Sequence, residues 1–77
     1  MTVAYVMINC ELGAEEAIIE KLKEIEQVKD VFETIGTHDM MVKLDAENFE
    51  KVRDIVSRNI QKIEKIRTIS TLVKKDN

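Results

Sequence analysis

The stretch Ile35-Gly36-Thr37-His38-Asp39 joins two runs of strand-like residues, 28–35 and 38–44. Glycine at the first of two central loop positions is what a type II′ hairpin turn requires, because the backbone there has a positive φ. The stretch therefore predicts a β-hairpin with Ile35 facing His38 and Val31 facing Val42. Its tip would carry two backbone N–H groups, a hydroxyl, the only histidine of the chain and a carboxylate.

Side chains alternate between the two faces of a strand, so the hairpin pairing also predicts which residues share a face. One face is the more apolar and should meet the helices; it holds Val31, Ile35, Met40, Val42 and Leu44. The other face holds Phe32, Thr34, Asp39, Met41 and Lys43. A three-residue loop would shift this pairing.

The segments before the hairpin predict a strand and a helix. Residues 3–8 are apolar at both odd and even positions, which is typical of a strand covered on both faces and hence of a central strand. Glu11-Leu12-Gly13 interrupts this run. The apolar spacing then becomes helical, with Ala14, Ala17, Ile18, Leu22 and Ile25 on one face and charged residues on the other.

The segments after the hairpin predict a second helix and a last strand. Asp45 is a favourable N-cap for a helix that closes at 59–62. The apolar stripe of this helix is Phe49, Val52, Ile55, Val56 and Ile60. Residues 63–74 alternate as a strand, with Ile66, Thr68, Ser70 and Leu72 on one face and Ile63, Arg67, Ile69, Thr71 and Val73 on the other.

The resulting order is β-α-β-β-α-β, an α+β arrangement of the ferredoxin-like type with a four-stranded antiparallel sheet. Right-handed crossovers place both helices on one face of that sheet. The other face stays uncovered although the first strand is apolar on both sides, and it also carries Phe32 and Met41. An open apolar sheet face predicts self-association, as a dimeric α/β sandwich of single domains spanning residues 1–77.

Composition excludes several classes of function. The net charge is −3, with 12 Lys and Arg against 15 Asp and Glu, and the aromatic residues are only Tyr5, Phe32 and Phe49. This opposes a nucleic-acid-binding role, which favours a basic stripe and stacking aromatics. The longest apolar run is too short to cross a membrane, and the lone Cys10 fits a reducing compartment. We therefore expect a soluble cytoplasmic protein, with Cys10 as a small buried apolar residue.

Two motifs resemble those of a known family. The pattern Gly36-Thr37-His38-Asp39-Met40-Met41-Val42-Lys43-Leu44 resembles the Gly-x-x-Asp hairpin of the regulatory (amino-acid metabolism, RAM) domain of the Lrp/AsnC family. Arg67-Thr68-Ile69-Ser70-Thr71-Leu72 is similar to the closing strand of that domain, and the first strand with Glu11-Leu12-Gly13 is similar to its opening. The resemblance extends from about Val3 to Val73.

The resemblance implies an effector-binding domain of a transcription regulator that binds an amino acid or a related metabolite. Such domains dimerise through their sheets and form rings of four or five dimers, with effector between the dimers. Because the chain begins at the first strand, it looks like a stand-alone version without the helix-turn-helix, and hence without direct DNA binding. Full-length Lrp/AsnC regulators are then candidate partners.

The resemblance also assigns ligand-binding roles by position. Gly36, Thr37 and His38 would line the pocket, Asp39 matches the effector-response aspartate, and Ile69, Ser70 and Thr71 match the contributing positions of the closing strand. No catalytic residue, metal ligand or cofactor is implied, so the expectation is a protein that is not an enzyme. Which amino acid binds, and whether the ring is an octamer or a decamer, does not follow from the sequence.

Structural explanations stand beside these roles. A turn requires Gly36 whatever the function, Asp39 could simply bond its own turn, and Thr71 is an ordinary strand residue. The alternative function is a small dimeric ferredoxin-like enzyme of the cofactor-free oxygenase or isomerase type. Adjacent strand residues point to opposite faces, which disfavours an acid–base pair of His38 and Asp39. A third possibility is a purely structural partner of a larger regulator.

Overall fold

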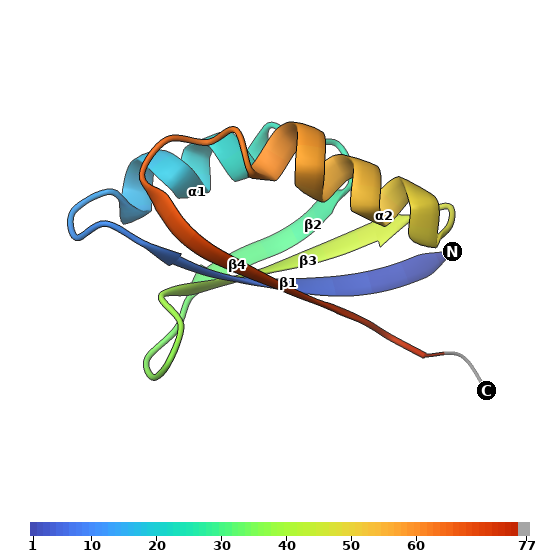
Figure 1. Ribbon diagram of the computed structural model, residues 1–77, viewed down its shortest axis with the longest axis horizontal. Coiled ribbons are helices and arrows are strands. Elements are labelled where there is room, and N and C mark those ends of the chain that lie inside the picture. Colours follow the sequence, from blue (N-terminus) through green and yellow to red (C-terminus); the bar gives the residue numbers. More distant parts are fainter. Residues whose placement is uncertain (76–77) are drawn as a thin grey trace.

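The computed structural model describes residues 1–75, which fold into a sheet with both helices on one face, as Figure 1 shows. The β-α-β-β-α-β order and the α+β class are confirmed. The elements are β1 (Thr2–Cys10), α1 (Glu15–Lys23), β2 (Val28–Glu33), β3 (Met40–Ala46), α2 (Phe49–Ile55), its π-helical continuation η1 (Val56–Ile60) and β4 (Ile66–Val73).

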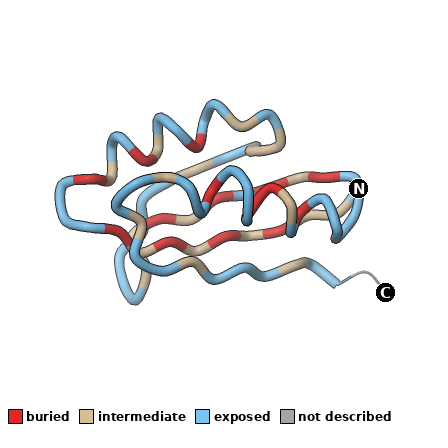
Figure 2. The backbone as a smooth tube through the Cα atoms, turned by 45° about the horizontal axis from the view of Figure 1, so that its top comes forward, coloured by how far each residue is buried: buried red, intermediate tan, exposed pale blue. Residues whose placement is uncertain are grey.

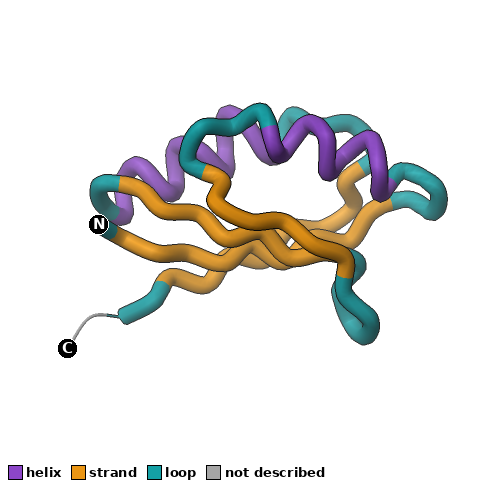
Figure 3. The backbone as a smooth tube through the Cα atoms, turned by 180° about the vertical axis from the view of Figure 1, so that it is seen from behind, coloured by secondary structure: helices purple, strands orange, loops and turns teal. Residues whose placement is uncertain are grey.

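β1 occupies a central place in the sheet, whose strand order is β2-β3-β1-β4. It pairs antiparallel with β3 on one side and with β4 on the other, and Figure 3 shows the sheet lying beneath the helices. The apolar residues of both parities in β1 predicted this position. A strand paired on both sides can hold one set of side chains under the helices and the other set on the opposite face.

The hairpin between β2 and β3 has the predicted register but a longer loop. Val31 lies opposite Val42, as predicted. The regular pairing ends at Glu33 and Met40, so the two-residue turn is wrong, and one further backbone bond joins the Thr34 N–H to the Asp39 carbonyl at 3.0 Å. The loop projects beyond the sheet, away from the helices (Figure 1). Ile35 is therefore fully exposed, and the expectation that it meets the helices is wrong.

The core lies between the sheet and the two helices, where Figure 2 shows the buried residues along the inner strands and on the inward sides of the helices. The predicted inward positions of β3 are confirmed, since Met40, Val42 and Leu44 have no exposed surface. The other side chains that are at most 1% exposed come from β1, α1, α2 and η1: Ala4, Val6, Ile8, Ile18, Leu22, Val52 and Ile60.

The second helix begins three residues later than predicted. Asn48, not Asp45, is its N-cap, and the Asn48 side chain accepts the Lys51 N–H at 2.9 Å. Asp45 still belongs to β3, and its N–H donates to the Gln27 carbonyl at 3.0 Å. Phe49 then falls at the first helical position, where it is 51% exposed, so its assignment to the buried stripe is also wrong.

A β-bulge between β1 and β4 changes the predicted faces of the last strand. Asn9 lies opposite Thr68 and Cys10 opposite Ile66, so Arg67 is an extra residue with no partner in β1. A bulge of this kind reverses the alternation of side chains beyond it. Ile66 consequently packs against the core with Ile69, and the prediction that Ile66 shares the face of Leu72 is wrong.

The face of the sheet opposite the helices is not covered by them and carries a group of apolar side chains, with Lys43 and Ser70 also on it. Met7 lies opposite Met41, and Tyr5 lies opposite Leu72. Phe32 is 46% exposed and Leu72 is 57% exposed, which are large fractions for side chains of this type. We call Tyr5, Met7, Phe32, Met41 and Leu72 the open sheet face. Its existence agrees with the expectation drawn from the sequence.

Cys10 ends β1 as a buried free cysteine, as predicted. Burial raises the pKa of its thiol, the negative charges of Glu15, Asp39 and Glu33 raise it further, and Arg67 partly offsets them. The thiol is therefore protonated at neutral pH and a poor nucleophile.

Replacement of Leu22 by alanine should destabilise the fold by about 2–5 kcal/mol, because it leaves a cavity under α1. Leu22 has no exposed surface, whereas the neighbouring Lys23 is exposed. Urea denaturation followed by circular dichroism measures the loss. Lys23→Ala is the matched control and should change the free energy of unfolding by less than about 0.5 kcal/mol. Equal effects of the two substitutions would contradict this description of the core.

At pH 7, Cys10 should react with a disulfide reagent more slowly than a free thiol does. The rate of this reaction should increase only when the pH exceeds the ordinary pKa of a thiol. The folded-state pKa is raised, so the thiol contributes stability below the unfolded-state pKa, and this contribution is lost as pH increases through the folded-state value. Stopped-flow measurements between pH 7 and pH 10, with urea-unfolded chain as the control, test this. Rapid reaction of the folded chain at pH 7 would contradict it.

Candidate functional site

Asp39 forms the junction between the hairpin loop and the sheet. Its Oδ2 accepts the backbone N–H of Cys10 at 2.8 Å, and its own N–H donates to the Ile8 carbonyl at 2.9 Å. The regular pairing of β1 with β3 ends at Ile8 and Met40. Beyond this pair, the Asp39 carboxylate accepts the Cys10 N–H in place of a backbone carbonyl of β3. A hydrogen bond to a charged acceptor is stronger than a neutral one, which fixes Asp39 at the end of the sheet.

Two further bonds hold the base of the loop together. The Thr34 hydroxyl donates to the His38 carbonyl at 2.7 Å, and the Thr37 hydroxyl lies 3.1 Å from His38 Nδ1. His38 and Asp39 are half-buried, whereas Gly36 and Thr37 at the tip are exposed. The loop therefore has a bonded base and a solvent-facing tip.

Gly36 adopts a φ of +133°, a conformation that L-residues with side chains rarely take. Apart from the two neighbouring residues in the chain, nothing lies within 4 Å of the place where a Cβ would stand, so space alone does not require glycine here. The requirement comes from the backbone conformation, which exposes the peptide groups of the tip. The turn therefore explains Gly36 without a ligand, although its open surroundings would admit one.

Asn9 and Thr34 are contributors that the sequence reasoning missed. The Asn9 side-chain oxygen accepts the Asp39 N–H at 3.1 Å, which makes this N–H a shared donor. A signal was present, because Asn9 follows Val3, Tyr5 and Met7 at the same parity and is the only amide among them. An amide on an otherwise apolar strand face indicates a polar junction.

The closing-strand positions lie on the far side of β1 from the tip. Ile69 is opposite Ile8, Ser70 is opposite Met7, and Thr71 is the next residue along β4. Two strand spacings separate β4 from β3, which is roughly 10 Å. Ile69 packs against the core, while Ser70 and Thr71 are exposed. Thr71 borders a hollow of about 340 Å³ beneath α2 and η1.

The seven predicted residues therefore form two groups within one chain. The first group is the tip and its base, Gly36, Thr37, His38 and Asp39. The second is Ile69, Ser70 and Thr71. A single ligand that contacts both groups would require a second subunit to bring another copy of one group beside the other. The assignment of these residues to a ligand stays a prediction.

Two absences apply to the part of the chain that the structure describes. Among residues 1–75, no three His, Cys, Asp or Glu side chains come together as a potential metal site. Over the same residues, the helices are too short and too polar to serve as a membrane span.

Comparison of the sequence with family models gives a match to the Lrp/AsnC ligand binding domain over residues 3–74. No curated protein sequence matches the chain.

Solved structures with the same fold include small chains and full regulators. TTHA0845 from Thermus thermophilus is 25% identical with a TM-score of 0.94, and the match covers 100% of this chain and 96% of that one. AsnC from E. coli is 18% identical with a TM-score of 0.92, covering 99% of this chain and 52% of AsnC.

A third solved structure is a complex with an amino acid. It is the transcriptional regulator NMB0573 from Neisseria meningitidis in complex with L-Met, which is 10% identical with a TM-score of 0.88. The match covers 97% of this chain and 50% of that one. At these low identities the likeness to AsnC and NMB0573 shows a shared fold. The family match spans nearly the whole chain, and the chain belongs to the Lrp/AsnC ligand-binding domain family.

Proposed function

We propose that this chain is an effector-binding domain that takes up a free amino acid, or a closely related metabolite, at an interface between subunits. Occupancy would favour one assembly state and thereby modulate transcription regulation, either through self-assembly or through partner regulators of the same family. Ligands shift an assembly equilibrium only by binding one state more tightly, and a pocket shared between subunits has this property.

The observation that carries the proposal is the position of the polar tip beside the open sheet face. Phe32 and Met41 lie opposite each other, one residue pair before the regular pairing ends and the loop begins. A subunit packed on this face would therefore lie beside the base of the loop. The proposal thus combines an apolar surface that favours association with polar groups at its border.

The chemistry of the tip suits a zwitterion. An amino acid needs an acceptor for its ammonium group and donors for its carboxylate. A carboxylate can accept about four hydrogen bonds, and Asp39 uses one of these positions for the Cys10 N–H. The remaining positions can accept hydrogen bonds from an ammonium group. Thr37 and the exposed backbone of Gly36 can supply donors. The L-Met complex of the Neisseria meningitidis regulator supports an amino acid as the ligand class.

The geometry favours this proposal over an enzyme of the oxygenase or isomerase type. An acid–base pair needs its members within hydrogen-bond reach of each other. Here His38 Nδ1 contacts the Thr37 hydroxyl, while the Asp39 carboxylate bonds to the backbone of β1. Both side chains belong to a loop that projects away from the space between sheet and helices (Figure 1).

The proposal extends to the assembly and its setting. We propose that dimers form through the open sheet face and associate further into a ring of dimers in the cytoplasm. The domain of residues 1–77 would act there without contacting DNA itself, and full-length Lrp/AsnC regulators are candidate partners. The net charge of −3 opposes direct binding to a polyanion.

Isothermal titration against the twenty amino acids should reveal at least one ligand, and Asp39→Asn should weaken its binding by about tenfold or more because the charge facing the ammonium is lost. Asparagine retains a side-chain oxygen for the Cys10 N–H, so this variant should stay folded. Asp39→Ala removes that oxygen as well and should also lower stability, by about 1–3 kcal/mol. Absence of heat with all twenty amino acids would count against the proposal.

Introduction of a charge at the centre of the open sheet face should prevent dimer formation. Met41→Glu is expected to lower the mass in solution to that of a monomer, because an unpaired carboxylate would be buried in the contact. Light scattering coupled to gel filtration measures the mass, and circular dichroism verifies folding. Leu12→Glu is the matched control, since Leu12 is 98% exposed in the loop between β1 and α1. A wild-type chain that is monomeric at high concentration would overturn the assembly model.

A further inference from the structure

We propose that the groove between α1 and the segment joining η1 to β4 is a second small-molecule site, which binds a small organic anion with a compact apolar body. The groove has a volume of about 570 Å³. This lies within the range of about 300–1,000 Å³ that is usual for ligand pockets. It lies in the helical layer and contains none of the tip residues, so it is separate from the site proposed above.

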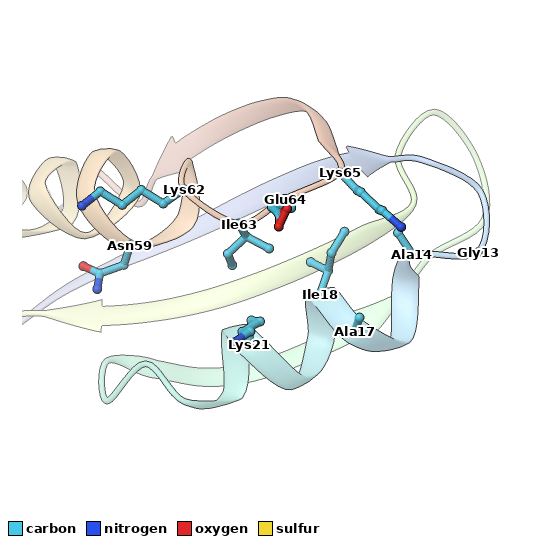
Figure 4. A pocket seen from close by; sticks show the side chains of 10 residues that line it. All are labelled: Gly13, Ala14, Ala17, Ile18, Lys21, Asn59, Lys62, Ile63, Glu64 and Lys65. Atoms are coloured by element: carbon cyan, nitrogen blue, oxygen red, sulfur yellow. The ribbon is translucent and has the colours of Figure 1, made fainter.

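The groove exists because each helix packs on the sheet rather than on the other helix. On the α1 side, the small residues Gly13, Ala14 and Ala17 lead up to Ile18, and Lys21 lines the groove further along the helix. Figure 4 shows Ile18 and Ile63 pointing toward each other from opposite sides. Ile18 is buried and Ile63 is half-buried, so the floor of the groove is apolar.

The charges around the groove favour an anion. Lys21, Lys62 and Lys65 line it, and Glu64 is the one carboxylate among its ten lining residues. This local excess of positive charge contrasts with the net charge of −3 of the whole chain. The adjoining hollow at the other end of α1 carries Glu24 and Glu26, so the anionic end of a ligand should point toward Lys65.

Lys65 is held in an unusual conformation. Its φ is +72°, in the left-handed region that costs a residue with a side chain about 1–2 kcal/mol. Its carbonyl accepts the Glu11 N–H at 2.9 Å, which fixes the backbone at this end of the groove. Figure 4 shows the Lys65 side chain extending from the start of β4 toward Ala14. Strained residues concentrate at binding sites, and here the strain places an ammonium group at the mouth of an apolar groove.

The ligand class follows from these features together. The apolar floor accommodates an aliphatic or aromatic group, and Lys65 supplies donors to a carboxylate. Lys65 is solvent-exposed, so the charge contribution should weaken as salt increases. Phenylacetate is a suitable probe because its neutral isostere, phenylacetamide, has the same shape and lacks the charge.

The test is a titration of isotope-labelled protein with phenylacetate up to about 20 mM, followed by NMR; a ligand of this size is expected to bind in the range of about 1 mM. The expected result is saturable shifts of the backbone signals of Ala17, Ile18 and Ile63, with phenylacetamide binding about tenfold more weakly. Shifts confined to the hairpin tip, or equal binding of acid and amide, would overturn the proposal. So would no saturable shift at all.

Variants separate the groove from the tip. Ala17→Leu fills the groove at an exposed helical position and should abolish the shifts, while Lys65→Asn removes the charge with a residue that tolerates a positive φ. Lys65→Asn should weaken phenylacetate binding by about threefold to fivefold, and Lys21→Gln should weaken it less, because Lys21 borders the hollow that carries Glu24 and Glu26. Lys23→Gln, an equal charge change on the same helix outside the groove, should leave it within about twofold.

Asp39→Asn should leave phenylacetate binding unchanged, because Asp39 lies outside the groove. Failure of amino-acid binding at the tip is therefore distinguishable from failure of the groove site. Equal weakening by Lys23→Gln and Lys65→Asn would show that binding reflects overall charge and would reject the specific site.

Discussion

The whole arrangement depends on one constraint, namely that β1 is apolar on both faces and lies in the middle of the sheet. Its alternate residues Ala4, Val6 and Ile8 have no exposed surface, because the helices cover them. The remaining set, with Tyr5 and Met7, lies on the open sheet face. The residues that the structure describes form two helices, and both crossovers place them on the same side of the sheet. These helices therefore leave the second face of the sheet uncovered.

At the end of β1, the apolar part of the sheet gives way to a group of polar side chains. There the carboxylate of Asp39 and the amide of Asn9 take over from the backbone pairing of β1 with β3. The same bonds fix the direction in which the hairpin loop leaves the sheet. Asp39 consequently has a structural role in one chain, and any role in ligand binding is additional to it.

The helical layer contains a groove because small residues occupy part of its surface. With Ala14 and Ala17 facing the segment that follows η1, the two helices do not fill the space above the sheet between them. Large residues at these positions would have closed the groove and added core. The structure instead leaves an apolar groove bordered by lysines on the side of the molecule that faces away from the proposed assembly contact.

Local sequence patterns determined the order of elements, the central place of β1, the inward residues of β3 and the pairing of Val31 with Val42. The first three follow from hydrophobic periodicity, which the chain carries residue by residue. The pairing of Val31 with Val42 depends instead on the position of the Gly36 loop between the two strands. Tertiary structure alone decided where elements end. Asp45 belongs to β3 because its N–H donates to the Gln27 carbonyl. Ile66 packs against the core because Arg67 forms a bulge. Ile35 is exposed because the hairpin loop projects beyond the sheet. Each of these outcomes depends on a hydrogen bond or contact between residues far apart in the chain, which no local pattern contains.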